Sequence, residues 1–304
     1  MANLAPDDYS LDRMATYAAH FTDVNGNFST SGSFIGNVSE ESRLARQTKA
    51  AKVADDYYSL VSPLYEQGWG QRFHFAPLTP GLNIGDSMTA YEREFARMAG
   101  LKKGMRVLDM GCGVGGPART LARSIGCEIV GVANNAWLVE RGEALTKEQG
   151  LDGLMSFVNS DFMNLPFEDA TFDAVYAFEA LCHAPDLNVV YKEAYRVLKP
   201  GGLFAFSDWA MTDNAPGPWY YGPAGDFWHA VDWKEFWQIF QMSPFFLFFA
   251  NSVYRIMVLF GVLPREVLQL MDTMWFCCRS VAYGGKLDIF TPMYMLASRK
   301  PGCK

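Results

Sequence analysis

The chain has 304 residues, a length that fits one large α/β domain with extensions and allows a sizeable core. The formal net charge is −7, which argues against a nucleic-acid partner because a phosphate backbone is recognised through lysine and arginine. Half of the residues are hydrophobic and 15% are aromatic, which indicates a large apolar cavity or an apolar surface that meets a partner or a lipid.

The cysteine spacing and the N-terminal residues bear on the cellular compartment. The six cysteines form no C-x-x-C pair, so we expect no metal site and reduced thiols in a cytosol-facing protein. Residues 1–21 do not place an apolar run after a basic segment, so we expect no signal peptide.

The first hundred residues predict a helical extension followed by an aromatic loop. Residues 1–34 read as a weakly ordered tail with one short helical piece. Residues 38–61 contain few helix breakers and predict a helix capped by Ser39. Residues 62–85 are loop-like and dense in aromatic side chains, and residues 87–101 predict an amphipathic helix.

From residue 105 onward, strand patterns alternate with helix patterns. The strand patterns occupy 105–116, which runs into a glycine turn, and 127–135, 155–162, 172–181, 203–210 and 289–301. The helix patterns occupy 117–126, 136–150 and 186–202. This alternation predicts an α/β fold with a doubly wound, mostly parallel sheet and helices on both faces.

The segment "DMGCGVGG" (109–116) joins the first strand to its helix. Its glycines let the backbone approach a ligand closely, and the helix N-terminus behind them favours an anion or a polar group. A loose G-x-G-x-x-G match with Gly116 in third place allows a dinucleotide, but that signal alone is weak. Asp109 discriminates between the readings, because a carboxylate would repel a pyrophosphate but suits a cationic amino-acid cofactor.

With "SDF" (160–162) and "LKPGG" (198–202), the D-x-G-x-G order resembles a class I S-adenosylmethionine methyltransferase. The resemblance implies that S-adenosylmethionine is the cofactor. The candidate cofactor residues in the glycine turn are Asp109, Gly111, Gly113 and Gly115.

Two further polar positions fit that cofactor. Asp161 ends the third strand, where an acid can accept from an adenine amino group, and Phe162 offers a backbone N–H; the alternative for Asp161 is a turn cap. In many class I enzymes an acid ends the second strand and holds the ribose hydroxyls. Here Ala133 takes that place, and the amides of Asn134 and Asn135 follow as candidate hydrogen-bonding groups.

A closer resemblance rests on several longer strings. In chain order they are "YEQGWGQRFHF", "GCGVGGPAR", "DFMNLPF", "FEALCHAPD" and "FTPMYM". The chain resembles the sterol 24-C-methyltransferase family over residues 50–213 and 216–301. The resemblance implies methyl transfer to the side-chain double bond of a sterol. It also implies a peripheral membrane or lipid-droplet surface: endoplasmic reticulum or lipid droplet in a eukaryote, and cytoplasm in a bacterium.

The chain departs from the family pattern at three places. Ala133 and Leu138 stand where the family carries polar side chains, and Ser59 stands where the family has an acid after the paired tyrosines. After Asp213 the family inserts a helix and a further strand that this chain lacks, so the sheet is expected to miss its usual sixth strand.

The stretch "YAFEALCHAPD" (176–186) places Glu179 and His183 at the carboxyl end of an apolar strand. Methylation of an alkene gives a carbocation, which needs shielding from water and a base that removes one proton. A helical turn would put the two side chains four apart on one face, and an apolar pocket would raise the pKa of Glu179 and lower that of His183. Either group is a candidate base. The alternative for Glu179 is that it only orients the cofactor, and the alternative for His183 is that it is a hydrogen-bonded core histidine.

The remaining candidates come from two aromatic stretches and the fifth strand. Aromatic faces stabilise a cation without quenching it, and Tyr65 is a catalytic candidate for that reason. Asp208 is a further candidate, for the sterol hydroxyl or for deprotonation, with a plain solvated acid as the alternative. The resemblance implies that Tyr57 and Tyr58 close a lid over the cofactor. The expected substrate-binding residues are Glu66, Trp69, Phe73, His74, Phe75 and Trp209, with core packing as the alternative for the aromatic cluster that includes Trp69, Phe73 and Phe75.

Residues 243–264 form an apolar block with Arg255 near its middle. A charge at mid-bilayer is costly, so we expect a helix that lies on a membrane face or roofs the sterol pocket, with a true span or a buried helix as alternatives. We thus expect an N-terminal extension (1–85), a cofactor-binding core (86–213) and a C-terminal lipid-binding region (214–304). The rival functions are methylation of another isoprenoid and a non-catalytic lipid-binding scaffold; a homo-oligomer is possible.

Overall fold

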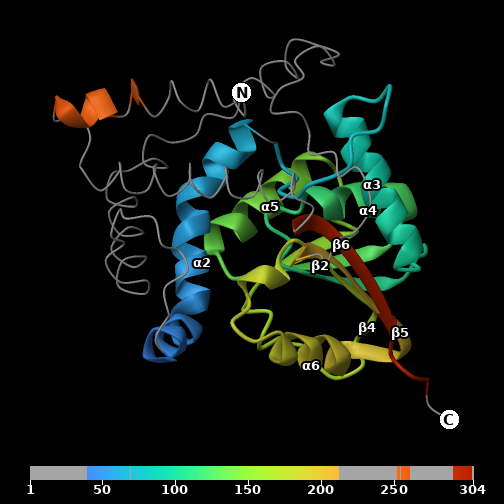
Figure 1. Cartoon of the computed structure of the whole chain (residues 1–304). Helices are drawn as coiled ribbons and strands as arrows, with labels where there is room; N and C mark the ends of the chain where they lie inside the picture. Colours follow the sequence, from blue (N-terminus) through green and yellow to red (C-terminus); the bar gives the residue numbers. More distant parts are fainter. Residues whose placement is uncertain (1–39, 69, 212–251, 254, 261–289, 303–304) are drawn as a thin grey trace.

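A six-stranded sheet is the centre of the structure, a computed structural model that describes residues 40–68, 70–211, 252–253, 255–260 and 290–302 (Figure 1). The strands are β1 (Arg106–Met110), β2 (Glu128–Ala133), β3 (Met155–Asn159), β4 (Phe172–Phe178), β5 (Leu198–Met211) and β6 (Phe290–Arg299). Their order is β3-β2-β1-β4-β5-β6, and each pair is parallel except the last, in which β6 runs antiparallel to β5. The predicted doubly wound, mostly parallel sheet is confirmed.

Helices cover both faces of this sheet. The helices are α2 (Glu40–Gly68), α3 (Ile84–Met98), α4 (Gly116–Ile125), α5 (Ala136–Glu148) and α6 (Leu187–Val197), with a short 3-10 turn, η2 (Leu181–His183). One buried cluster joins α3, α4 and α5 to strand residues such as Val107 and Tyr176, and a second joins α6 to Leu108 and Val175. Successive strand residues point to opposite faces, so one continuous apolar run fills both clusters. Figure 1 shows α6 on the far side of the sheet from α3, α4 and α5.

Side-chain caps set the starts of three helices. Asn83, Asn135 and Asp186 accept a hydrogen bond from the backbone N–H of the second or third helical residue, which satisfies donors that a helix leaves open at its first turn. The predicted helices of the core are confirmed with ends that differ by a few residues. The strand predicted at 289–301 is also confirmed, as β6.

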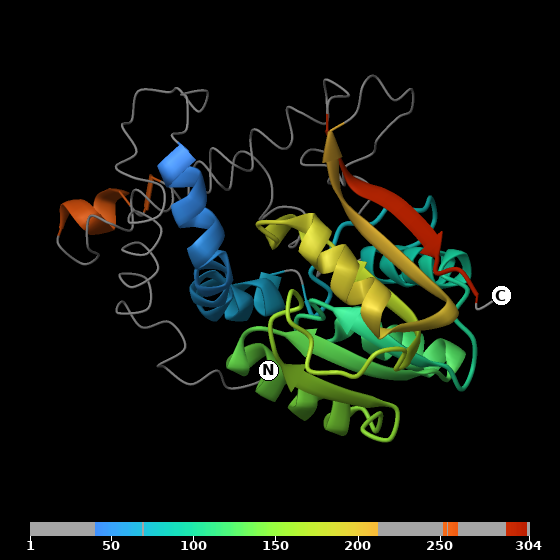
Figure 2. The ribbon, with the colours of Figure 1, turned by 90° about the horizontal axis from the view of Figure 1, so that it is seen from below.

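Helix α2 is longer than predicted. The sequence favoured a helix over 38–61 and a loop from residue 62, yet α2 runs to Gly68 and contains Pro63. Residues 61–63 are buried, so packing keeps the turn helical although proline removes a backbone hydrogen bond. Seen from below, α2 lies beside the sheet and contacts α5 and η2 (Figure 2).

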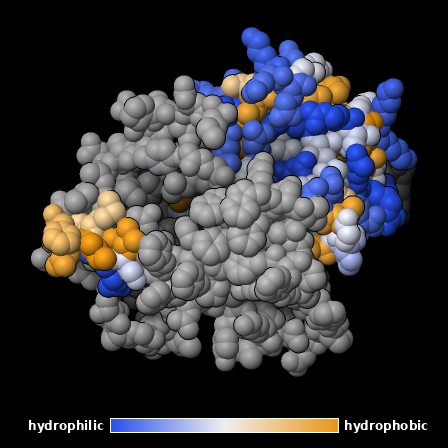
Figure 3. Space-filling model, turned by 90° about the horizontal axis from the view of Figure 1, so that it is seen from above, coloured by the Kyte–Doolittle hydropathy of each residue, from blue (hydrophilic) through white to orange (hydrophobic). Residues whose placement is uncertain are grey.

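Few described residues belong to the predicted membrane-facing block. Residues 252–253 and 255–260 are helical up to a final turn, and the rest of 243–264 lies outside the described residues. Large apolar side chains of this segment are exposed, namely Val253, Ile256, Leu259 and Phe260, and they colour as a hydrophobic group at one edge of Figure 3. In the described part of the chain, none of the helices combines the length and the apolar character that crossing a bilayer requires. The expected absence of a strand after residue 213 falls on residues 212–289, most of which are not described.

The start of α4 touches the loop that follows α2. A Cβ atom added to Gly116 would lie 1.8 Å from the backbone oxygen of Gln71, a contact that only movement of the loop could relieve. The glycine turn and the aromatic loop are therefore packed with no room for a methyl group between them.

We expect Gly116→Ala to destabilise the protein by about 1–3 kcal/mol, because overpacking forces the backbone apart. The matched control is Gly153→Ala, since a Cβ atom at Gly153 would meet nothing within 4 Å. Thermal unfolding followed by circular dichroism measures both. Equal unfolding midpoints for the two variants would contradict the close contact.

Candidate functional site

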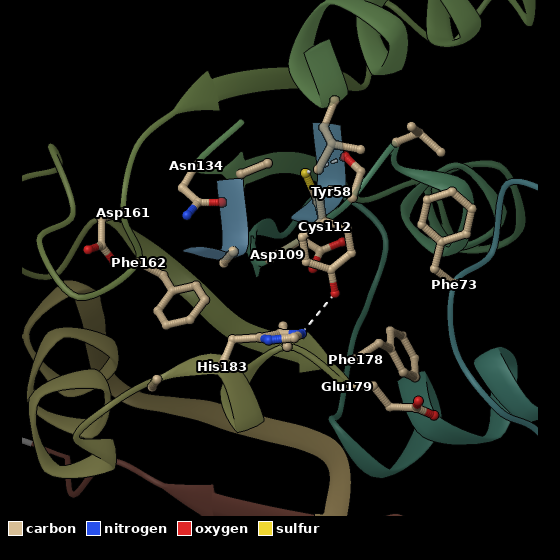
Figure 4. A pocket seen from close by; sticks show the side chains of 18 of the residues that line it. Tyr58, Phe73, Asp109, Cys112, Asn134, Asp161, Phe162, Phe178, Glu179 and His183 are labelled. Carbon is tan, nitrogen blue, oxygen red and sulfur yellow. Dashed lines mark hydrogen bonds between the residues drawn. The ribbon is translucent and has the colours of Figure 1, made fainter. Parts of the chain in front are cut away.

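A cavity opens at the carboxyl ends of β1, β2 and β4, beneath α2 (Figure 4). It encloses about 930 Å³ of empty space, open solvent at its mouth included. The glycine turn, the ends of the strands, η2 and three alanines of α2 all contribute to its wall. The lining residues that bear on function are Ala50, Ala51, Ala54, Tyr58, Gln71, Phe73, His74, Asp109, Gly111, Gly113, Ala133, Asn134, Leu138, Asp161, Phe162, Phe178, Glu179 and His183.

The glycine turn needs its glycines. Gly111, Gly113 and Gly115 have φ values of 86°, 54° and 76°, in the left-handed region that side chains disfavour. At Gly111 a Cβ atom would also lie 2.3 Å from the Cβ atom of Ala180. The turn therefore leaves its backbone open toward the cavity, as a close-fitting ligand requires.

Asp109 lies at the floor of this cavity. The residue is 2% exposed, and the Tyr176 hydroxyl donates to Asp109 Oδ2 at 2.9 Å. Burial raises the pKa of Asp109 to about 7, against the lowering effects of that hydrogen bond and of the charge of His74. A buried carboxyl group of this kind ionises readily once a cation binds beside it.

Asp161 and Phe162 lie at another part of the wall. Asp161 Oδ1 accepts from the Met163 N–H at 2.8 Å, so this acid caps its turn while it lines the cavity. The Phe162 ring also lines the cavity and lies near Gly111. The cofactor role predicted for Asp161 and the turn-capping alternative are therefore compatible in this geometry.

The two asparagines after β2 take different places. Asn134 lines the cavity and donates from Nδ2 to the Ala51 carbonyl at 3.0 Å. Asn135 is 2% exposed and is absent from the cavity wall. Its Oδ1 caps α5, and its Nδ2 donates to Asp55 and Ser59 on α2. Asn135 therefore ties α2 to the start of α5 and does not make the predicted contact with a cofactor.

Glu179 is held in an uncommon backbone conformation at the end of β4. Its φ of 46° is one of two positive values among the described non-glycine residues, and such strain gathers at functional sites. The Phe75 N–H donates to Glu179 Oε1 at 2.6 Å, and Trp209 Nε1 donates to Oε2 at 2.9 Å. Desolvation raises the pKa of Glu179 to about 7, opposed by these donors and by His74.

His183 faces the cavity from η2. Its Nε2 is hydrogen-bonded to the Tyr58 hydroxyl at 2.8 Å, across the cavity from α2 (Figure 4). Desolvation lowers the pKa of His183, so the directions predicted for both pKa shifts are confirmed. The predicted helical turn is shorter than expected, because η2 begins only at Leu181. The Glu179 carboxylate consequently points away from His183 in Figure 4.

Three predicted residues serve other contacts. Asp208 is 6% exposed and accepts from the N–H groups of Cys182 and Trp209 at 3.0 and 2.7 Å. The Tyr65 hydroxyl is hydrogen-bonded to Tyr57 at 2.5 Å. Glu66 forms an ion pair with Arg141 at 2.5 Å. Asp208, Tyr65 and Glu66 are not among the residues that line the cavity, and their polar atoms bond to other protein groups.

The other predicted substrate residues divide as follows. The rings of Phe73 and His74 line the cavity. Phe75 and Trp209 do not line the cavity, but each donates a hydrogen bond to Glu179, which does. Trp69 lies outside the described residues.

Sequence reasoning missed two residues that matter to the geometry. Tyr176 lies opposite Asp109 in the register of β4 and β1, a pairing that a single sequence does not reveal. Glu92 of α3 is fully buried against His74, and only its place on the buried face of an amphipathic helix hinted at it. Among the described residues, no group of three histidine, cysteine or acidic side chains is arranged to hold a metal ion.

Comparisons with known families agree with this geometry. Residues 108–206 match the model of a methyltransferase domain, and residues 237–302 match that of a sterol methyltransferase C-terminal region. S-adenosylmethionine is accordingly the cofactor, and the open glycine turn with a buried carboxyl group for a cation fits it.

Solved structures share the fold at low identity. A crystal structure of the cyclase SpnF is 21% identical, with a TM-score of 0.60, and covers 83% of this chain and 97% of its own. Geranyl diphosphate methyltransferase in complex with S-adenosylmethionine is 16% identical, with a TM-score of 0.51, over 75% of this chain and 98% of its own.

Curated relatives are closer in sequence. The sterol 24-C-methyltransferase of Aspergillus fumigatus is 35% identical over 86% of this chain and 83% of its own length. The corresponding protein of Saccharomyces cerevisiae is 33% identical over 86% of this chain and 81% of its own. The chain therefore belongs to the sterol 24-C-methyltransferase family of S-adenosylmethionine-dependent C-methyltransferases.

Proposed function

We propose that this protein transfers the methyl group of S-adenosylmethionine to carbon 24 of a sterol side-chain double bond and then removes a proton from the resulting carbocation. The observation that carries the proposal is one cavity lined both by the glycine turn and by Glu179 and His183, two side chains that can accept a proton. The substrate, a sterol, is a fused-ring lipid.

The cavity wall suits a cationic intermediate. When bound, the cofactor supplies an electrophilic methyl group, and the protein has to align the alkene with it. Phe73, Phe178 and Tyr58 present aromatic rings to the cavity, and ring faces stabilise a carbocation without reacting with it. Aromatic and aliphatic walls also exclude water, which would otherwise trap the cation as an alcohol.

Glu179 and His183 are both suitable bases, for different reasons. Glu179 is charged for part of its population near pH 7, and its two donors hold the carboxylate in one orientation. His183 is neutral at that pH because desolvation lowers its pKa, so its ring has a nitrogen that can accept a proton. Tyr58 orients that ring through its hydroxyl group. One of the two accepts the proton, directly or through water.

We also propose that the segment 252–260 lies on a lipid surface, through which a sterol reaches the protein without crossing water. The exposed fractions of Leu259 and Phe260 are 79% and 77%, unusual for side chains of this size in water. The proposal places the protein on a cytosol-facing membrane or on a lipid droplet.

A product assay tests the main proposal. The purified protein is incubated with labelled S-adenosylmethionine and a panel of sterols and linear isoprenoids, and the products are identified by mass spectrometry. Label on carbon 24 of a sterol is expected. Label only on linear isoprenoids supports the rival substrate class, and no label with any lipid supports a non-catalytic scaffold.

Glu179→Gln and His183→Ala are expected to lower turnover by about 10²–10⁴-fold for whichever residue is the base, while cofactor binding stays close to wild type. Single-turnover rates and calorimetry with S-adenosylmethionine measure the two effects. Near-normal rates in both variants would remove both residues from the chemistry.

Cofactor binding should depend on the charge of Asp109. The carboxyl group is protonated below its pKa of about 7 and ionised above it, so affinity for the cationic cofactor should fall as the pH drops through that value. Tyr176→Phe removes a hydrogen bond that lowers this pKa and should move the fall to higher pH. Calorimetry from pH 6 to pH 9 measures the shift, with Tyr191→Phe as control; identical profiles would refute the link.

Leu259→Asp combined with Phe260→Asp should reduce flotation of the protein with phosphatidylcholine vesicles, because two charges replace the apolar contact. The control is Lys52→Asp, a charge change on the exposed side of α2. Undiminished flotation of the double variant would exclude this segment as the docking surface.

A further inference from the structure

A buried histidine and a buried glutamate lie in contact near Glu179. His74 is 1% exposed, and Glu92 of α3 is fully buried. His74 Nε2 lies 2.9 Å from Glu92 Oε1, and His74 Nδ1 lies 2.8 Å from the carbonyl oxygen of Phe75. Both ring nitrogens of His74 therefore face oxygen atoms.

The contacts fix the orientation of the imidazole ring. The Phe75 carbonyl can only accept, so Nδ1 carries a proton. Nε2 and Glu92 Oε1 share one proton across 2.9 Å, which ties the ring to α3. Arg72 Nε lies 3.5 Å from the same Glu92 oxygen and faces the pair with a positive charge.

Two aromatic rings stack on the imidazole ring. The His74 ring stacks on Phe178 with centroids 5.0 Å apart and on Tyr91 at 5.9 Å. His74 is thus held by Glu92 at one edge and by two neighbouring rings.

The pair is connected to Glu179 through two neighbours. Phe75, whose carbonyl accepts from His74, donates its own N–H to Glu179 Oε1 at 2.6 Å. Phe178, which stacks on His74, directly precedes Glu179 in β4. A change at His74 would therefore reach the Glu179 carboxyl group by both routes.

We propose that Glu92 and His74 form a positioning pair, which fixes Phe75 and Phe178 around Glu179 and so sets the surroundings of its carboxyl group. The pair itself does not touch the substrate double bond. The proposal rests on the proposed function only for its kinetic consequence, because ionisation of Glu179 can be measured without substrate.

Other ionisable groups also face Glu179. Asp208 on β5 opposes its ionisation, whereas His74 favours it. Tyr58 and Cys182 remain neutral near pH 7, because burial raises the pKa of each. His74 also favours ionisation of Asp109, so one ring acts on both acids.

The indole of Trp209 offers a direct readout. Its Nε1 donates to Glu179 Oε2 at 2.9 Å, so tryptophan fluorescence should change as Glu179 ionises. The wild type should show a step near pH 7 that Glu179→Gln abolishes. In His74→Gln, which removes the ring that lowers the pKa of Glu179, the step should move to higher pH by about one unit or more.

A second variant guards against a folding defect. The double variant His74→Gln/Glu92→Gln replaces the pair by two amides of similar shape and should also show an upward shift. Glu94→Gln is the control, since it removes an exposed carboxylate from the same helix. An unshifted step in either His74 variant with a native circular dichroism spectrum would overturn the inference.

The wild-type protein provides a test that needs no variant to fold. The chain contains four histidines, few enough for ¹⁵N NMR of the ring nitrogens to resolve a buried one. One histidine should show a protonated Nδ1, the ring nitrogen that faces the Phe75 carbonyl; four rings without a protonated Nδ1 would refute the assignment. In the sterol assay, the acid limb of kcat/KM should follow the fluorescence step, and a shifted step without sterol methylation would refute the proposed function alone.

Discussion

The hydrogen bonds that Glu179 receives hold the site together. Phe75 comes from the loop after α2, Glu179 from the end of β4 and Trp209 from β5, so one carboxyl group joins three segments that are distant in sequence. The donors also partly offset the cost of burying a charge. A left-handed backbone at Glu179 aims the carboxylate at these donors and away from His183, which separates the two candidate bases.

Different observations support the fold and the chemistry of this protein. The same architecture occurs in a structure named for a cyclase, so the sheet and its helices do not by themselves indicate methyl transfer. What distinguishes the chain is its sequence likeness to sterol 24-C-methyltransferases together with acidic and basic groups at an apolar cavity. Part of the high aromatic content is explained by the rings that surround Glu179 and His74 at this cavity.

The sequence predicted the sheet well because buried parallel strands read as apolar runs and the glycine turn has a fixed place after the first of them. It predicted Asp109, Glu179 and His183 at the cavity for the same reason, since strand ends meet at one edge of the sheet. It could not predict the partners of these groups. The Asp109–Tyr176 pair depends on strand register, and the roles of Asp208 and Glu66 depend on which donors the tertiary fold brings near them. The extension of α2 past Pro63 likewise depends on burial rather than on local preference.

Helix α2 has a consequence for the timing of the reaction cycle. Three of its alanines roof the cavity, and the amides of Asn134 and Asn135 tie the helix down. A ligand that leaves on this side has to release that roof and break several hydrogen bonds together. The residence time of the spent cofactor therefore depends on how firmly this helix is fastened.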